Sequence, residues 1–507
     1  MNKTAKGIIA LGAVLALLGG GYAALRLTEP KEEGGSSASS EVSEEKQSVI
    51  LIKDDATEDT AEYHAGVIKT VDVKNATDEL HVVQKSSKTE ESAALYTLDG
   101  YQDVLMKDSI IGTLANNVNE LATDDLIEEN PADLAKFGLA SPTATVDIVY
   151  ESGKKFRLLV GDKAPSGDMT YVMLDGVNNV YTVRSSALDN YTKTTIELVE
   201  TTVLESPDEL PIVKSLKIER DDIDYDILLK YDDKEDDSQH SGGTSSAHVM
   251  VEPTSAYLAV ERATDITTGM FGLSAADVYS VHCTDADIAE AGLKDPFCTV
   301  TMECDDGKTH VLLLSEPFSD SENGKCCYAM LEGGNVIYTV TTENAKWAVV
   351  KPIDIASKIF IASYVWNISD LKVSTNSGDK GEFKLTKKNP NEEKDSYTYE
   401  DFNAEYNGKE FDSERFRQFY SFLISANAED FALGEKIPDS APMASVEYTD
   451  SHTNETVKLD FYELSSMTAL IAVNGESKFK VTKSYVETLV GNIQKIEGTE
   501  DFVTTWK

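Results

Sequence analysis

The residue types best suited to chemistry gather in one short stretch of this 507-residue sequence. All the cysteines of the chain lie within 45 residues: Cys283, Cys298, Cys304, Cys326 and Cys327. Side chains alternate between the two faces of a strand, so Cys298 and Cys304 share a face with apolar neighbours such as Val300. The length of the following loop puts His310 on that face too.

Three interpretations of these cysteines stay open. Buried thiols act as small hydrophobic side chains in many protein cores. In an oxidising compartment, Cys298 or Cys304 would instead form a disulfide with Cys326 or Cys327. The third interpretation is a metal site built from Cys304, His310 and either Cys326 or Cys327. The sequence has no C-x-x-C motif, and the odd number of cysteines leaves at least one unpaired within the chain.

The patterns of the other polar residues are more typical of a solvated surface than of a metal or catalytic site. His240 and His248 lie in an acidic, Gly/Ser-rich segment, where a solvated loop competes with a weak divalent-ion site. The acidic runs at 221–222 and 232–237 lack the EF-hand spacing. The motifs H-E-x-x-H, G-x-S-x-G, G-x-G-x-x-G and G-x-x-x-x-G-K-[ST] do not occur. We therefore name no catalytic or cofactor-binding residue and expect no cofactor.

The composition excludes one class of function and indicates a folded protein. The chain carries 46 Lys+Arg against 89 Asp+Glu, a formal net charge of −43. Such acidity excludes a general nucleic-acid binder, because the phosphate backbone would be repelled. The hydrophobic fraction of 41% is high enough for packed cores.

The N-terminus predicts the compartment. Residues 7–25 carry no charge and follow two lysines, Lys3 and Lys6. As a helix this run would span about 28 Å, close to the hydrocarbon thickness of a bilayer. We predict a signal-anchor transmembrane segment over residues 1–27, with the lysines cytoplasmic and the bulk of the chain extracytoplasmic. A cleaved signal peptide is the alternative.

The next segment has the composition of a tether. Gly, Ser and Glu dominate residues 28–48, which show no apolar periodicity. Such sequences form flexible, charge-extended linkers. We expect a flexible acidic tether over residues 28–60.

Internal similarity predicts three tandem modules. The sequence FGLASPTATVDIVYESGKKFRLLVGD begins at Phe137, and the similar AGLKDPFCTVTMECDDGKTHVLLLSE begins at Ala291. YVMLDGVNNVYTV at 171–183 matches YAMLEGGNVIYTV at 328–340, and a fainter copy begins at Ala441. Tyrosines recur with the copies, which points to packing, although they also suggest a carbohydrate platform. The period of 140–157 residues is too long for a solenoid and implies duplicated globular units.

Each copy shows the same order of elements. Alternating patterns predict strands at 68–73 and 80–84, at 215–220 and 225–230, and at 371–374 and 383–386. A helix follows, with an apolar stripe of Val104, Ile111, Leu114, Val118 and Leu121 in the first copy and an N-cap at 412–413 in the third. Four strands and a short closing helix complete the copy. The fold class is α+β, with antiparallel sheets and packed helices.

These patterns give the domain boundaries. We expect modules at 61–205, 206–360 and 361–507, the third being divergent. The second carries an exposed inserted loop at 232–248.

The anchor, the tether and the module motifs together resemble a known family. The motifs are Gly-Leu-x-x-Pro, a hairpin, Val-Gly-Asp at 160–162 and Tyr-x-Val at 181–183. They resemble an uncharacterised bacterial domain-of-unknown-function family of membrane-anchored extracytoplasmic proteins encoded beside gliding-motility-type ABC transporters. The resemblance covers most of residues 60–360 and, more weakly, 361–507. It implies an accessory role near a transporter and carries no site residues.

These observations lead to one expected function and two alternatives. We expect a non-catalytic accessory or scaffold protein on the outer face of the bacterial cytoplasmic membrane. Its expected partners are the membrane, through the N-terminal helix, and a protein such as an ABC transporter permease. The alternatives are a cell-wall or glycan-binding surface protein and an extracytoplasmic hydrolase.

Overall fold

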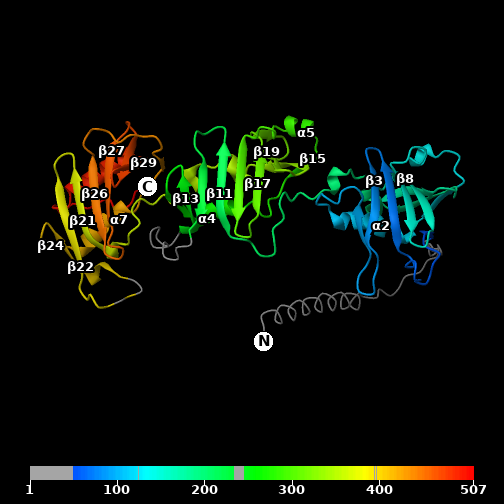
Figure 1. Ribbon diagram of the computed structural model, residues 1–507, viewed down its shortest axis with the longest axis horizontal. Coiled ribbons are helices and arrows are strands. Elements are labelled where there is room, and N and C mark those ends of the chain that lie inside the picture. The colour runs from blue at the N-terminus through cyan, green and yellow to red at the C-terminus, as the bar shows by residue number, and fades with distance from the viewer. Residues whose placement is uncertain (1–48, 124, 233–244, 393, 395–396, 507) are drawn as a thin grey trace, which may run out of the picture. The chain divides into compact units, whose positions relative to one another are not determined.

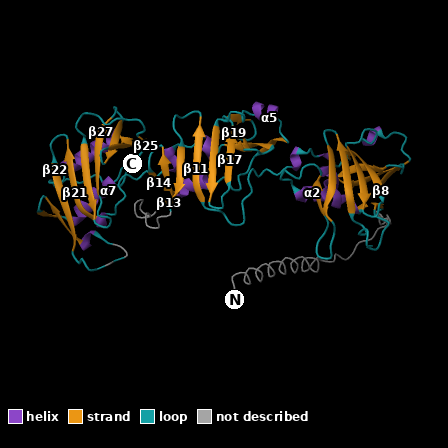
Figure 2. Cartoon of the chain, viewed as in Figure 1, coloured by secondary structure: helices purple, strands orange, loops and turns teal. Residues whose placement is uncertain are grey.

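Alternating apolar residues build most of the chain into antiparallel strands, with few helices (Figures 1 and 2). The computed structural model describes residues 49–507, apart from residues 124, 233–244, 393, 395–396 and 507. The expected α+β class with antiparallel sheets is confirmed. Most strands within the described residues belong to three large sheets.

The first sheet has the strand order β4-β3-β2-β7-β8-β9-β10-β6. Its strands are β2 (Ile68–Asn75), β3 (Glu79–Ser86), β4 (Leu95–Leu98), β6 (Asp125–Glu129), β7 (Ala144–Tyr150), β8 (Lys155–Lys163), β9 (Met169–Leu174) and β10 (Asn179–Arg184). The accompanying helices and 3₁₀ turns are α2 (Asp108–Asn119), η1 (Ala135–Phe137), α3 (Ser185–Leu188), η2 (Asp189–Thr192) and η3 (Ile196–Leu198).

The second sheet has the order β14-β13-β12-β11-β16-β17-β19-β20-β15, with β18 paired to β19. Its strands are β11 (Val213–Arg220), β12 (Ile227–Tyr231), β13 (Ser245–Glu252), β14 (Ala256–Ala259), β15 (Asp277–Val281), β16 (Cys298–Cys304), β17 (Thr309–Leu314), β18 (Phe318–Asp320), β19 (Gly324–Leu331) and β20 (Val336–Thr341). Its helical elements are α4 (Val260–Thr267), α5 (Asp285–Glu290), η5 (Lys346–Ala348) and α6 (Pro352–Ile355).

The third sheet has the order β24-β23-β22-β21-β26-β27-β28-β29-β25. Its strands are β21 (Ile368–Thr375), β22 (Lys380–Lys387), β23 (Phe402–Tyr406), β24 (Lys409–Phe411), β25 (Asp430–Phe431), β26 (Ala444–Asp450), β27 (Thr456–Glu463), β28 (Thr468–Val473) and β29 (Glu476–Thr482). Its helical elements are η6 (Val365–Asn367), η7 (Tyr399–Asp401), α7 (Ser413–Leu423) and α8 (Lys483–Gln494).

The strand pairing has one irregularity in common among the three sheets. The register shifts by one residue at the start of β2, β11 and β21, where each strand pairs with β7, β16 or β26. The shifts lie between Ile68 and Thr70, between Val213 and Ser215, and between Ile368 and Asp370. The three strands therefore occupy corresponding places in their sheets.

Helices cover one face of the third sheet and bury its aromatic residues. Phe383 on β22 packs against Phe416 and Phe419 of α7, with ring centroids 5.1 and 5.7 Å apart. Asp412 caps α7, since its Oδ1 accepts hydrogen bonds from the backbone N–H groups of Glu414 and Arg415. The predicted N-cap is thus confirmed. In the first sheet α2 buries Ile111, Leu114 and Val118, whereas the predicted stripe residues Val104 and Leu121 lie outside this helix.

The Gly-Leu-x-x-Pro segment crosses the other face of the first sheet and forms a clasp, residues 137–142. Phe137 and Leu139 pack in a small second core with Met173 and Val180. The clasp leaves no space for side chains beneath it: a Cβ on Gly161 would lie 2.2 Å from the Phe137 carbonyl oxygen. Gly138 has φ = 72° and lies against the Asp162 carboxyl group. The Val-Gly-Asp motif therefore serves packing of the clasp.

Two predicted boundaries are wrong. The tether was expected to reach residue 60, but β1 (Ile50–Ile52) pairs with β5 (Leu121–Ala122), and Ile52 is fully buried. The inserted loop was expected to reach residue 248, but β13 begins at Ser245, because Val249 and Met250 continue an alternating strand that pairs with β12.

None of the helices within the described residues has the length and apolar character needed to cross a membrane. The transmembrane segment predicted at 1–27 lies outside those residues.

Candidate functional site

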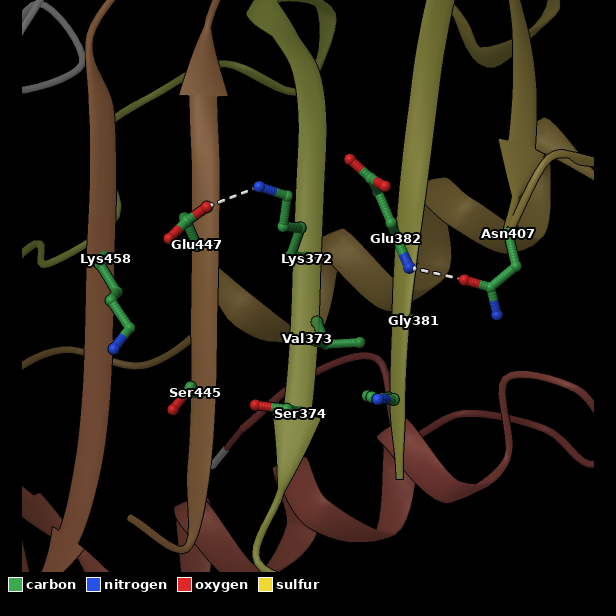
Figure 3. A pocket seen from close by; sticks show the side chains of 10 residues that line it. Lys372, Val373, Ser374, Gly381, Glu382, Asn407, Ser445, Glu447 and Lys458 are labelled. Carbon is green, nitrogen blue, oxygen red and sulfur yellow. Dashed lines mark hydrogen bonds and ion pairs between the residues drawn. The ribbon is translucent and has the colours of Figure 1, made fainter. Parts of the chain in front are cut away.

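The third sheet carries a hollow of about 500 Å³ on the face opposite its helices (Figure 3). Strands β21, β22, β26 and β27 form its floor, and the turn after β23 forms one side. Ten residues line it: Lys372, Val373, Ser374, Lys380, Gly381, Glu382, Asn407, Ser445, Glu447 and Lys458. Most are polar, and all except Asn407 come from four neighbouring strands.

The two-residue period of the strands places these side chains. In β21, Leu371 and Val373 are buried toward the helices, so Lys372 points to the opposite face. The same alternation in β26 buries Val446 and turns Glu447 outward. Figure 3 shows Lys372 and Glu447 side by side in front of the sheet, with helices behind it.

A row of alternating charges, the charge row, crosses four strands of this face. It consists of Glu382, Lys372, Glu447 and Lys458, each opposite the next in the strand register. The Lys372 ammonium lies 2.8 Å from Glu447 Oε1, and this hydrogen bond raises the pKa of Lys372. Opposite charges directly across an antiparallel pair stabilise the sheet by about 0.2–1 kcal/mol per pair. The charge row thus stabilises the sheet and also presents alternating charges on its surface.

A second polar group supports the lining residues Ser445 and Lys458 at one end of the hollow. Asp460 is largely buried, accepts a hydrogen bond of 2.6 Å from the Ser445 hydroxyl, and pairs with Lys458 at 2.9 Å. On the opposite side, Asn407 Oδ1 accepts a hydrogen bond from the Glu382 backbone N–H. These contacts fix the orientations of side chains around the hollow.

The arrangement of charged groups in the hollow is suited to recognition of a partner with complementary charges. Lys372 and Lys458 each lie beside a carboxylate, and the Ser445 hydroxyl donates directly to Asp460 with no histidine between them. A partner with complementary charges could exchange its own ion pairs for those of the charge row.

The five cysteines lie in different surroundings. All five are free thiols. Cys298 and Cys327 lie in the main core, and burial raises the pKa of both thiols to about 12. Adjacent residues of a strand face opposite ways, so Cys326 points away from Cys327, although both are fully buried. Cys304 lies at the end of β16 with 7% exposure.

The predicted metal ligands do not converge. His310 does share the face of Met302, its partner in the register, but its ring packs edge-on against Phe271, 5.6 Å between centroids. Over the part of the chain that the structure describes, no group of three or more His, Cys, Asp or Glu side chains could hold a metal ion. The apolar surroundings fit the interpretation of the cysteines as small hydrophobic side chains.

The solvated-loop interpretation is wrong for His248. This residue lies on β13 with 8% exposure, and its Nε2 is 2.8 Å from the Val213 carbonyl oxygen. Burial lowers the pKa of its imidazole. His240 lies outside the described residues.

The recurring tyrosines serve packing. Tyr181 and Tyr338 are buried, and burial raises the pKa of the Tyr338 phenol to about 12. Tyr171 packs against Phe137 at 5.0 Å, and Tyr328 packs against Tyr279 at 4.4 Å between ring centroids. These four side chains do not form an exposed row.

Comparison with known protein families gives a match to part of the chain. Residues 97–296 match the model of a family described as a domain of unknown function, DUF4340. The resemblance to an uncharacterised domain-of-unknown-function family is thereby confirmed. The matched stretch begins at β4 in the first sheet and ends just before β16 in the second, so its ends do not coincide with the ends of a sheet. Neither the curated proteins nor the solved structures include a match to this chain.

Sequence reasoning missed the residues of the hollow. Their signal was present, because Lys372 and Ser374, and Ser445 and Glu447, stand at alternate positions of predicted strands. Such patterns ordinarily mark a solvated face. Only the pairing of four strands shows that the charges align.

Proposed function

We propose that this protein is a membrane-anchored extracytoplasmic accessory or scaffold protein that docks on an ABC transporter permease or another envelope protein. In this proposal, three tandem modules at 61–205, 206–360 and 361–507 follow an N-terminal transmembrane helix. The charge row on the uncovered face of the third sheet is the observation that carries the docking role. A docking partner would present the reverse order of charges across this face.

Sequence and structure support different parts of the proposal. The uncharged run at 7–25 after two lysines supports the anchor and its orientation. The common strand order and the corresponding register shifts support the three modules. The tether would set the reach of the modules and their effective concentration at the membrane.

The charge row favours docking because of its composition and its position. It combines lysines and carboxylates on rigid strands, in a chain whose net charge is strongly negative. Exposed charged pairs contribute little to stability, about 0–1 kcal/mol each, but they do control partner choice and association rates. The hollow that these four residues line, about 500 Å³, is large enough to admit several side chains.

A charge swap separates docking from folding. Lys372→Glu places three carboxylates side by side in the register and should weaken both partner capture and stability. The triple variant Glu382→Lys/Lys372→Glu/Glu447→Lys restores two of the three opposite pairs in reversed orientation, while Lys458 keeps its pair with Asp460, so stability should return toward that of the wild type. We expect in-cell crosslinking followed by mass spectrometry to recover an envelope protein with the wild type and at least about tenfold less with either variant.

A second swap controls for general charge effects. Lys74 and Glu79 form an exposed pair on the first sheet, so Lys74→Glu/Glu79→Lys should leave capture unchanged. Capture that is undiminished by the third-sheet swap would contradict docking through the charge row. Recovery of polysaccharide alone, with no protein partner, would contradict the accessory role itself.

A further inference from the structure

A stacked aromatic pair, with Tyr364 exposed and Trp366 half-buried, lies at the start of the third sheet. Tyr364 and Trp366 flank Val365 at the turn η6, and their rings stack with centroids 4.6 Å apart and planes within 6°. Tyr397 lies on the Trp366 side, 6.3 Å between centroids. Tyr364 is 39% exposed and forms the outer member of the stack. The Tyr364 ring is therefore partly open to solvent and is supported by two further rings.

The fold does not require aromatic residues at this place. Tyr364 precedes Ile368 by four residues, and Ile368 pairs with Asp450 at the register shift. The corresponding residue of the first sheet is His64, four residues before Ile68, which pairs with Tyr150. There the backbone N–H of His64 donates to Glu151 at 2.7 Å, and the imidazole ring contacts the polar side chains of Glu151 and Ser87. Packing of the sheet alone does not account for Tyr364 and Trp366.

A small polar hollow adjoins the exposed ring. Its volume is about 60 Å³, close to that of two water molecules in the liquid. Tyr364 forms part of its lining, together with Asn367, Asp450, His452 and Glu455. The backbone N–H groups of His452 and Thr453 donate to Asp450 Oδ1 at 2.7 and 3.2 Å, which fixes this carboxylate in place. The hollow thus combines amide, carboxylate and imidazole groups beside an aromatic face.

From this juxtaposition we propose that the Tyr364–Trp366 stack and its polar hollow bind an uncharged saccharide. The C–H groups on one face of a pyranose carry partial positive charge and match the negative face of an aromatic ring. A ring hydroxyl or hydroxymethyl group fits the hollow and bonds to its carboxylate and amide groups. A Leu-sized anchor from a protein partner does not fit it. Asp450 and Glu455 disfavour uronic acids and phosphorylated polymers.

The test is a titration of the full-length protein in detergent. The probes are chitotetraose and cellotetraose as neutral chains and tetragalacturonate as an anionic one. Trp366 is an intrinsic reporter within the site; of the other two tryptophans, Trp347 is fully buried and Trp506 packs against Tyr485. We expect saturable fluorescence changes with at least one neutral chain, weaker binding of the anionic chain, and loss of the signal in Trp366→Phe while isothermal calorimetry still detects binding.

Substitutions at position 364 decide the role of the ring. Tyr364→Ala should weaken neutral-chain binding at least about tenfold, and Tyr364→Phe should retain it, because the ring face remains. Tyr462→Ala, on β27 of the same sheet, is the matched control and should bind normally. Circular dichroism confirms folding of each variant. The proposal is overturned if no neutral chain binds at millimolar concentration, if the anionic chain binds better, or if Tyr364→Ala binds like the wild type.

Discussion

Glu151 is held by a dense set of hydrogen bonds at the start of the first sheet. Its carboxylate accepts from the His64 backbone N–H, Gln84 Nε2 and Ser87 Oγ at 2.7–2.8 Å, and His64 Nδ1 lies at 3.2 Å. Burial by itself raises the pKa of this carboxyl group, but the hydrogen bonds outweigh burial and hold the pKa at about 2. The ionised form is therefore favoured in the folded protein.

This residue predicts an acid-sensitive contribution to stability. A carboxyl group whose pKa is lower in the folded state stabilises the fold above its unfolded pKa, near 4.5, and loses that contribution as pH falls toward 2. Glu151→Gln should lower the free energy of unfolding by about 2 kcal/mol at pH 7 and by much less at pH 3. Urea unfolding at both pH values measures this. An equal loss at both would show that the charge of Glu151 is not responsible.

The cysteines predict a pattern of chemical reactivity. Cys298, Cys326 and Cys327 have no exposed surface, Cys304 is 7% exposed, and Cys283 is the most exposed of the five. With iodoacetamide at pH 8, we expect Cys283 to be labelled first, although more slowly than a fully exposed thiol because burial raises its pKa. The three buried thiols should be protected until the protein unfolds. Peptide mass spectrometry reads each site. Rapid labelling of Cys327, or a native disulfide, would contradict the buried-thiol interpretation.

The absence of a side chain at Gly161 allows the clasp to pack closely against β8. Gly161 lies directly under the Phe137 carbonyl oxygen, with no space for a methyl group. Gly161→Ala should lift the clasp from β8 and cost about 1–3 kcal/mol. Gly112→Ala is the control, because Gly112 lies inside α2 and its new Cβ would meet only Asn116, at 3.8 Å; it should stabilise by up to about 1 kcal/mol. Thermal unfolding compares the two, and similar shifts in both would refute the clasp.

Elements with long regular patterns could be predicted from the sequence, and short or mixed ones could not. Strands such as β7 and β26 alternate over seven residues, and α7 has both an apolar stripe and an N-cap at Asp412. β1 has only three residues and follows a polar segment, so its pairing with β5 decides its structure. The turn with Tyr364 and Trp366 has no periodicity, and its stacking depends on tertiary contacts. The candidate sites were therefore missed although the sheets were found.

The charge of the whole molecule also affects its stability. With a net charge of −43, the excess carboxylates of the folded chain repel one another. The repulsion acts over about 10 Å at 0.1 M salt. We expect the midpoint of the first thermal transition to rise by a few degrees between 20 and 500 mM NaCl. An equal rise in KCl would indicate screening in place of specific ion binding. A falling midpoint would mean that ion pairs such as Lys372–Glu447 outweigh the repulsion.

The pairing of β1 with β5 has a mechanical consequence. If the chain is tethered through its N-terminus, a pulling force enters the folded part at residue 49 and loads β1 first. Asp54 is bonded to Ser152 at 2.6 Å and to the Gly66 backbone N–H at 3.0 Å, so it shares this load before β2 does. The segment that contains β1 and Asp54 would then detach at a lower force, while the main sheet stays folded. Optical-trap pulling from the N-terminus should show a small early extension, absent in Asp54→Ala, before the large sheets rupture.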